Sequence, residues 1–274
     1  MPNHHLLRIL SPCLSLFLLF FFGSFHGVLS TFSTIYGNVS SSSQCGDIFI
    51  KYPFWTVSNA AVHHGYPGLG LSCSFGSNYP TLSLTNHTYF VTKINYINET
   101  LTLVDIDAAD QRCPRARHNL TIGSLPFNYN SANVNLTFFF NCDAPPSVSS
   151  PSLDITCLQS GDKWSYVFTN MSQEEEAAFD EACHCEETVV AVVKRTEVTV
   201  GNVTEEFAAA MHAGFMLDWE APKECNACEL SGGRCAFNRN EQVMCFCDDE
   251  SIHNDGSSCK GRDEICSNIC DTTC

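Results

Sequence analysis

Apolar and polar residues alternate in two neighbouring stretches of the first half of the chain, 89–96 (YFVTKINY) and 101–107 (LTLVDID). Alternation with a period of two is the pattern of a β-strand that buries one face. The polar residues Asn98-Glu99-Thr100 separate the two stretches, so the pattern predicts a β-hairpin with its turn at Asn98. Further strands are predicted at 120–122 and 134–140.

The second half of the chain predicts strands at 164–169 and 188–200, and a helix at 172–183 (SQEEEAAFDEAC). Ser172 and Glu175 have the spacing of a capping box, and the acidic residues of the first turn complement the helix dipole. We therefore expect a mainly β, disulfide-rich fold, with two small β-modules, one or two short helices and a cysteine-rich tail.

A run rich in proline and serine, 144–151 (APPSVSSP), is typical of a linker or an exposed loop. The predicted modules are therefore 44–142 and 153–248, joined by a linker at 143–152. The last segment, 249–274, has too few apolar side chains to form a core, so we expect disulfides to order it.

The N-terminus carries a short apolar run, 14–22 (LSLFLLFFF), behind Arg8. The run is shorter than the roughly 20 apolar residues that span a bilayer, and the pattern is typical of a secretory signal peptide at 1–30. An uncleaved anchor is the alternative. No second apolar stretch has membrane length, so we expect a secreted chain with no membrane span after cleavage.

The chain has 17 cysteines, and Cys13 lies in the predicted signal peptide. The remaining even number favours a disulfide framework, whose pairing the spacing does not reveal. Zinc is the alternative for Cys225-x-x-Cys228 and Cys245-x-Cys247, but a secreted chain favours disulfides and no metal. The disulfide candidates are Cys45, Cys73, Cys113, Cys142, Cys157, Cys183, Cys185, Cys225, Cys228, Cys235, Cys245, Cys247, Cys259, Cys266, Cys270 and Cys274.

Asn-x-Ser/Thr sequons are dense in this chain, which implies a glycosylated surface if the chain passes through the secretory route. They lie at Asn38, Asn86, Asn98, Asn119, Asn135, Asn170 and Asn202.

The formal charge of the whole chain is -16. Nucleic acids require a basic surface, so they are excluded as partners. The sequence also lacks a nucleophile elbow, a zincin helix and a phosphate-binding glycine loop, so we expect no enzyme activity.

Two motifs resemble known domains. Residues 45–55 (CGDIFIKYPFW) and 65–73 (GYPGLGLSC) resemble the galacturonan-binding domain of plant wall-associated receptor kinases. Residues 214–219 (GFMLDW) and the cysteines from Cys225 to Cys247 resemble the C-terminal domain of the same ectodomains, in the leaf-rust-resistance type of receptor-like kinase. The resemblance implies a receptor-like protein at the plant cell wall, whose relatives cross the plasma membrane once.

The sequence departs from this family in several respects. His64 stands where the family has a cysteine, which puts one family disulfide in doubt. The family's transmembrane helix and kinase are also missing from this sequence. Two other functions therefore remain open: a soluble decoy or co-receptor that binds a peptide or another ectodomain, and a truncated receptor-like kinase.

The resemblance implies a pectin ligand, de-esterified polygalacturonate or its oligomers, with one carboxylate per sugar. A strongly acidic protein repels such a polyanion at long range, so binding needs a local basic patch or a bridging calcium ion. Arginine pairs well with carboxylates. The predicted ligand-binding residues are Arg112, Arg115, Arg117, Lys51 and Lys93. Alternatively, the three arginines pair with acidic neighbours, namely Asp105, Asp107 and Asp110.

Overall fold

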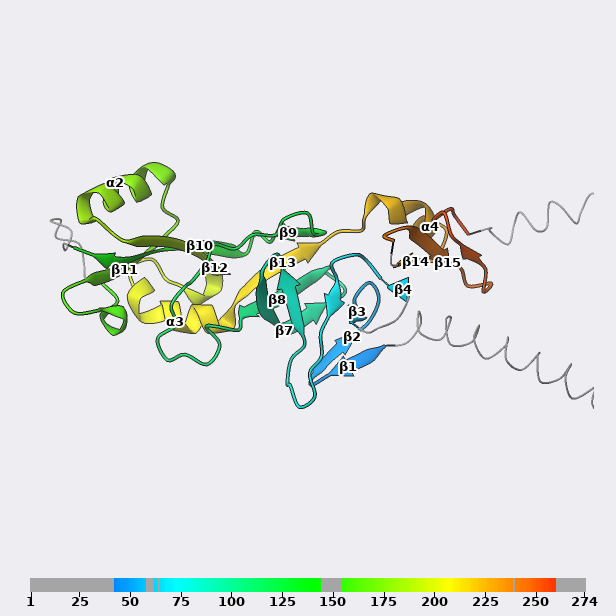
Figure 1. Cartoon of the computed structure of the whole chain (residues 1–274), viewed down its shortest axis with the longest axis horizontal. Helices are drawn as coiled ribbons and strands as arrows, with labels where there is room; N and C mark the ends of the chain where they lie inside the picture. The colour runs from blue at the N-terminus through cyan, green and yellow to red at the C-terminus, as the bar shows by residue number, and fades with distance from the viewer. Residues whose placement is uncertain (1–41, 58–61, 64, 144–153, 239, 260–274) are drawn as a thin grey trace, which may run out of the picture.

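The computed structural model describes residues 42–57, 62–63, 65–143, 154–238 and 240–259, which form an elongated molecule (Figure 1). The predicted signal peptide, Asn38, His64 and the last three cysteines lie outside the described residues. The fold is mainly β with short helices and several disulfides, as the sequence predicted. Among the described helices, none is long and apolar enough to cross a bilayer.

A five-stranded sheet, here called the central sheet, lies in the middle of the molecule (Figure 1). Its neighbouring strands are antiparallel. The predicted hairpin is confirmed, because β7 pairs with β8 around a turn that contains Asn98. In spatial order, the strands are β6 (Thr81–Leu84), β7 (His87–Asn95), β8 (Thr100–Asp105), β13 (Phe215–Trp219) and β9 (Phe127–Tyr129).

A second sheet of three strands has β10 at its centre, paired with β11 and β12. Its core contains Phe138 and Phe140, against which Phe207 of a helix packs. The predicted capping box is confirmed at the start of α2, where Ser172 and Glu175 exchange hydrogen bonds. The elements are β10 (Asn133–Cys142), β11 (Trp164–Thr169), β12 (Glu187–Lys194), α2 (Gln173–Cys183) and α3 (Val203–Ala213), with the 3-10 turns Thr156–Leu158 and Arg195–Glu197.

Two of the strand predictions need correction. Residues 120–122 lie in the loop between β8 and β9 and pair with no strand, although Ile122 is buried in the core of the central sheet. An apolar side chain that is buried from a loop gives the same local sequence pattern as a short strand, which explains the wrong prediction. The strand predicted at 188–200 ends at Lys194, where a 3-10 turn follows.

The remaining strands are short and lie toward one end of the molecule (Figure 1). A four-stranded sheet contains β16 (Ile252–His253), β15 (Val243–Phe246), β14 (Arg234–Asn238) and β4 (Val62–His63). Two strand pairs complete the fold: β1 (Ser43–Cys45) with β2 (Ile48–Ile50), and β3 (Trp55–Thr56) with β5 (Gly70–Leu71). The 3-10 turn Lys223–Cys225 and helix α4 (Asn226–Leu230) precede β14.

The predicted boundary at 143–152 does not separate two folding units. Strand β13, from the second predicted module, lies between β8 and β9 of the first. Residues 144–153 lie outside the described residues, but the strands before and after them, β10 and β11, pair in one sheet. Leu103 and Leu217 are fully buried in one shared core, so neither half completes its core alone.

Within the described residues, six disulfides join twelve of the candidate cysteines: Cys45–Cys73, Cys113–Cys157, Cys142–Cys185, Cys225–Cys235, Cys228–Cys245 and Cys247–Cys259. The prediction that Cys183 forms a disulfide is wrong, because its thiol is free and buried beside Phe139 and Tyr166.

The zinc alternative does not hold either. The sulfurs of Cys245, Cys247 and Cys259 lie close together, but each is in a disulfide and offers no thiolate.

The carboxylate of Glu229 in α4 connects the cysteine-rich end to the N-terminal strands. Both Tyr52 and Tyr66 donate their hydroxyl hydrogens to it, with distances of 2.7 and 2.8 Å from Tyr66 to its two oxygens. The hydroxyl of Tyr52 also accepts a hydrogen bond from the backbone N–H of Cys235 at 3.0 Å. One half-buried acid therefore holds two segments that are far apart in the sequence.

Replacing this acid is expected to weaken the fold. Glu229→Ala leaves two half-buried tyrosine hydroxyls without their acceptor, which we expect to lower the free energy of unfolding by about 2–3 kcal/mol. The matched control is Glu224→Ala, an exposed acid in the preceding turn, with an expected effect within about 0.5 kcal/mol. Denaturant unfolding of both variants measures the difference. Equal stability of the two would contradict the role assigned to Glu229.

Candidate functional site

The two faces of the central sheet differ in polarity. In β8, Leu101 and Leu103 point into the core, while the intervening Thr100 and Thr102 lie on the opposite face. Successive residues of a strand point to opposite faces, so the same division holds in β13, where Leu217 enters the core. The second face is polar at Thr100 and Thr102, although both threonines are largely buried, with 8% and 6% of their surface exposed.

Cross-strand pairing arranges these side chains in two rows. Lys93 of β7 is opposite Thr102 of β8, which is opposite Met216 of β13. The adjacent row is made of Asn95, Thr100 and Asp218. Register alone therefore places residues more than a hundred positions apart on one surface.

These two rows form the floor of an open groove of about 560 Å³, here called the sheet groove. Asn98, Asn130 and Lys194 also line it. Lys194 lines the groove because β12 ends beside β13. The backbone N–H of Lys194 donates there to the carbonyl of Gly214 at 3.0 Å.

The side chain of Asn133 fixes β13 against the three-stranded sheet. Its Nδ2 donates to the carbonyl of Met216 at 2.7 Å, and its Oδ1 accepts from the N–H of Met216 at 2.9 Å. Asn133 is also the β10 partner of Lys194 in the ladder. One amide side chain thus sets the position of both a floor residue and a border lysine.

The groove offers charge and hydrogen bonds of a defined kind. Within the described part of the chain, neither Lys93 nor Lys194 has an ion-pair partner, whereas Asp218 accepts a hydrogen bond from Asn130 Nδ2 at 2.5 Å. The nearly buried Thr100 and Thr102 add hydroxyl groups to the floor. Two ammonium groups over a floor of hydroxyl and amide groups suit a ligand that has both carboxylates and hydroxyls.

The structure gives the predicted arginines different roles. Arg115 pairs with Glu187, and its guanidinium lies 4.0 Å from the ring centroid of Phe140. It is therefore part of the packing between the β8–β9 loop and β12. The sequence offered three nearby aspartates as partners, but the actual partner is Glu187. It lies 72 residues away in the chain, so local sequence did not reveal it.

Arg112 and Arg117 are exposed on the β8–β9 loop, and Lys51 is exposed just after β2. None of them lines the sheet groove. Arg117 borders a much smaller cavity of about 40 Å³ beside His118. Of the five predicted residues, the structure places Lys93 alone in the groove.

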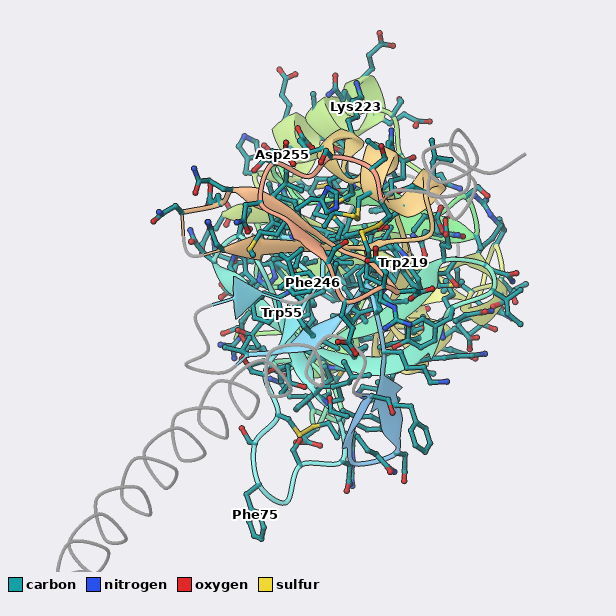
Figure 2. The ribbon with its side chains drawn as sticks, turned by 90° about the vertical axis from the view of Figure 1, so that its right-hand side faces the viewer. Trp55, Phe75, Trp219, Lys223, Phe246 and Asp255 are labelled. Carbon is teal, nitrogen blue, oxygen red and sulfur yellow. A yellow bond between two sulfur atoms is a disulfide. The ribbon has the colours of Figure 1, made fainter. Side chains whose placement is uncertain are left out.

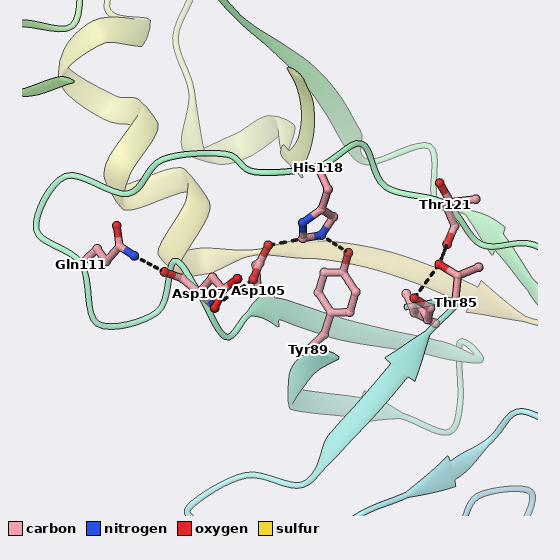
Figure 3. A network of polar contacts seen from close by, with 8 residues as sticks. Thr85, Tyr89, Asp105, Asp107, Gln111, His118 and Thr121 are labelled. Atoms are coloured by element: carbon pink, nitrogen blue, oxygen red, sulfur yellow. Dashed lines mark hydrogen bonds and ion pairs between the residues drawn. The ribbon is translucent and has the colours of Figure 1, made fainter. Parts of the chain in front are cut away.

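The β8–β9 loop is fixed to the sheet by a polar network (Figure 3). His118 Nε2 lies 2.8 Å from the hydroxyl of Tyr89 and 3.5 Å from Asp105 Oδ2. The ring of His87 stacks on His118 with centroids 3.4 Å apart. At the far end of the loop, the hydroxyl of Thr85 donates to the carbonyl of Thr121 at 3.4 Å.

This network predicts a pH dependence of stability. Burial lowers the pKa of His118 below its ordinary value of 6.5, and His87 lowers it further, which together outweigh the opposing effect of Asp105 and Asp107. A depressed histidine pKa means that the unfolded chain takes up the proton more readily. The stabilisation is therefore present above about pH 6.5 and is lost as the pH falls below it.

The measurement is the melting temperature of the wild type and of His118→Gln between pH 7.5 and pH 5. The wild type is expected to lose more stability on acidification, because the glutamine does not titrate. Parallel curves for the two proteins would show that His118 does not cause the pH dependence.

Lys93 is the groove residue that the sequence indicated as a ligand contact. Of those it missed, Lys194, Met216 and Asp218 come from the second half of the chain. Lys194 and Arg195 form a basic pair at the end of an apolar strand, which is a weak signal for a surface cation. Met216 and Asp218 belong to the motif GFMLDW, whose alternation could have placed them on one face. No local signal indicated that this face adjoins β8.

Comparison with known protein families gives two matches. Residues 40–105 match the family described as wall-associated receptor kinase, galacturonan-binding. Residues 156–250 match the family described as wall-associated receptor kinase, C-terminal. The groove residues on β7 and β8 fall in the first match and those on β12 and β13 in the second, so both matched regions contribute to the sheet groove.

Three similar proteins come from Arabidopsis thaliana. The proteins named leaf rust 10 disease-resistance locus receptor-like protein kinase-like 1.2 and 2.8 are 29% and 28% identical over 73% and 83% of this chain. The chain spans only 30% and 24% of their lengths. A putative RING-H2 finger protein, ATL21A, is 27% identical over 78% of the chain and 56% of its own length. No solved structure matches.

Proposed function

Because this chain carries the two extracellular domains of wall-associated receptor kinases, we propose that it binds acidic galacturonan of the cell wall through the sheet groove. The observation that carries the proposal is the position of Lys93 and Lys194. Both line one groove, and neither has an ion-pair partner within the described residues.

The chemistry of the groove fits a de-esterified pectin segment, which alternates carboxylates with hydroxyl groups along its length. Lys93 and Lys194 pair with carboxylates, while Asn95, Thr100 and Asp218 exchange hydrogen bonds with sugar hydroxyls. The chain as a whole is acidic, so it does not attract a polyanion from a distance. Affinity therefore depends on these local contacts.

The role of the groove in this proposal is to bind and not to cleave. Hydrolysis of a glycosidic bond generally needs two carboxyl groups on either side of the bond. Asp218 is the single carboxylate among the residues that line the groove, and it already accepts a hydrogen bond from Asn130. The groove consequently supports a receptor-like, non-catalytic function.

Calorimetric titration with oligogalacturonides of defined esterification tests the proposal. De-esterified oligomers are expected to bind, whereas fully methyl-esterified oligomers, which lack the charge, are not. Direct pairing with lysine predicts that a calcium chelator leaves the affinity unchanged, whereas calcium bridging predicts that it abolishes binding. Equal affinity for the charged and esterified oligomers, or no binding of either, would overturn the proposal.

Contact with another receptor ectodomain is a second candidate function, favoured by Phe75. This residue is fully exposed and points into solvent from the loop between β5 and β6 (Figure 2). The loop is closed by the hydrogen bond from Ser77 N–H to the carbonyl of Ser74 and begins next to the Cys45–Cys73 disulfide. Phe75→Ala is expected to weaken such a contact and to leave oligogalacturonide binding unchanged.

A further inference from the structure

The predicted glycosylation sites are not spread evenly over the surface. A second groove of about 440 Å³ adjoins the sheet groove, and Asn130 lines both. Three sequon asparagines line this second groove, namely Asn119, Asn135 and Asn170. All three are exposed.

The local structure brings these three side chains together and leaves them available. Asn135 lies in β10, and its backbone carbonyl accepts a hydrogen bond from the N–H of Asn170 at 3.1 Å, just after β11. Asn119 lies on the other side, where its Oδ1 accepts from the N–H of Val190 in β12 at 2.8 Å. That bond uses the oxygen of the Asn119 amide, so the nitrogen that would carry a glycan remains free.

Asn98 also lines the sheet groove. It lies on the β7–β8 turn, beyond the last paired residues Asn95 and Thr100. The side chain of Asn98 is exposed at this turn. Sequons therefore lie at the β7–β8 turn, which lines the sheet groove, and in the adjoining second groove.

We propose that N-glycans on Asn119, Asn135 and Asn170 fill the second groove and confine the polysaccharide to the sheet groove. The glycosylated protein therefore selects short acidic oligosaccharides, or chain ends, over long chains. A glycan is bulky and hydrated, and three of them leave no path for a polymer past Asn130. This inference rests on the proposed function, since it concerns the length of the ligand bound at the same site.

The test compares oligogalacturonides of increasing length against two forms of the wild-type protein: fully glycosylated, and deglycosylated by an endoglycosidase after folding. With glycans present, affinity is expected to stop rising at short lengths. Without them, long oligomers are expected to gain about tenfold or more, equivalent to about 1.4 kcal/mol, while the shortest oligomer is unchanged. Identical length profiles for the two forms would overturn the inference.

Variants give the same test without the enzyme. Thr121→Val, Asn135→Gln and Asn170→Gly together remove the three sequons. Thr121→Val retains the hydrogen bond of Asn119 to Val190, and glycine suits the positive φ of 52° at Asn170. The control is Asn86→Gln with Asn202→Gln, two exposed sequon positions that line neither groove. The triple variant is expected to gain affinity for long oligomers, and the control is not.

The outcomes separate this inference from the proposed function. Binding of acidic oligomers with a length profile independent of glycans refutes the inference and leaves the function standing. Mass spectrometry that finds Asn119, Asn135 and Asn170 unoccupied in the secreted protein also refutes the inference. Absence of acidic oligomer binding in every form contradicts both.

Discussion

Reversal of charge at both groove lysines, Lys93→Glu with Lys194→Glu, is expected to lower the affinity for de-esterified oligogalacturonides by about 100-fold or more. Each lysine contributes a charged hydrogen bond worth roughly 1.5–3 kcal/mol. Loss of both, with repulsion added, corresponds to about 3 kcal/mol or more, and each 1.4 kcal/mol is tenfold in affinity. Calorimetry of the double variant measures the change directly.

The matched control places the same change in charge elsewhere on the surface. Lys51→Glu with Lys223→Glu alters the net charge equally, and neither lysine lines the groove. We expect the control to lose affinity only through long-range repulsion, a loss that added salt removes. Equal losses in the two double variants would mean that binding responds to net charge and not to the groove.

Gly214→Ala is expected to prevent folding or to lower the free energy of unfolding by more than about 4 kcal/mol. Gly214 ends helix α3 with φ of 73° and ψ of -157°, a conformation essentially restricted to glycine. A Cβ at this position would lie 1.9 Å from the carbonyl oxygen of Leu103 in β8. The clash separates β13 from β8 and so disrupts the floor of the sheet groove.

Gly161→Ala is the control for this variant. Gly161 also has a positive φ, 64°, but a Cβ added there would meet no other part of the chain within 4 Å. The expected cost is about 1–2 kcal/mol from the backbone conformation alone. Expression yield and denaturant unfolding compare the two variants. If Gly214→Ala were no less stable than Gly161→Ala, β13 would tolerate displacement from β8, contrary to the close packing described above.

Features set by neighbouring residues could be predicted from the sequence. The β7–β8 hairpin follows from alternation on either side of a polar turn, and the start of α2 follows from Ser172 and Glu175. Both depend on contacts within a few residues. The mainly β, disulfide-rich class followed from these local patterns and from the number of cysteines.

Long-range pairing explains what the sequence did not reveal. The acids near Arg115 in the chain suggested its partners, but the fold brings Glu187 to it instead. The proline- and serine-rich segment suggested a linker between modules, yet the strands before and after it in the sequence pair in one sheet. Lys194 and Asp218 join Lys93 only because β13 inserts beside β8, a pairing that no periodicity encodes.

Zero-length cross-linking tests most directly whether acidic galacturonan binds in the sheet groove. A carbodiimide couples a uronic carboxylate to a lysine amine only where the two are in contact, and mass spectrometry identifies the coupled peptide. Coupling of de-esterified oligogalacturonide to Lys93 and Lys194, and none with the methyl-esterified oligomer, is the predicted result. Coupling confined to Lys51, Lys163 or Lys223, or no coupling at all, would contradict binding in the groove.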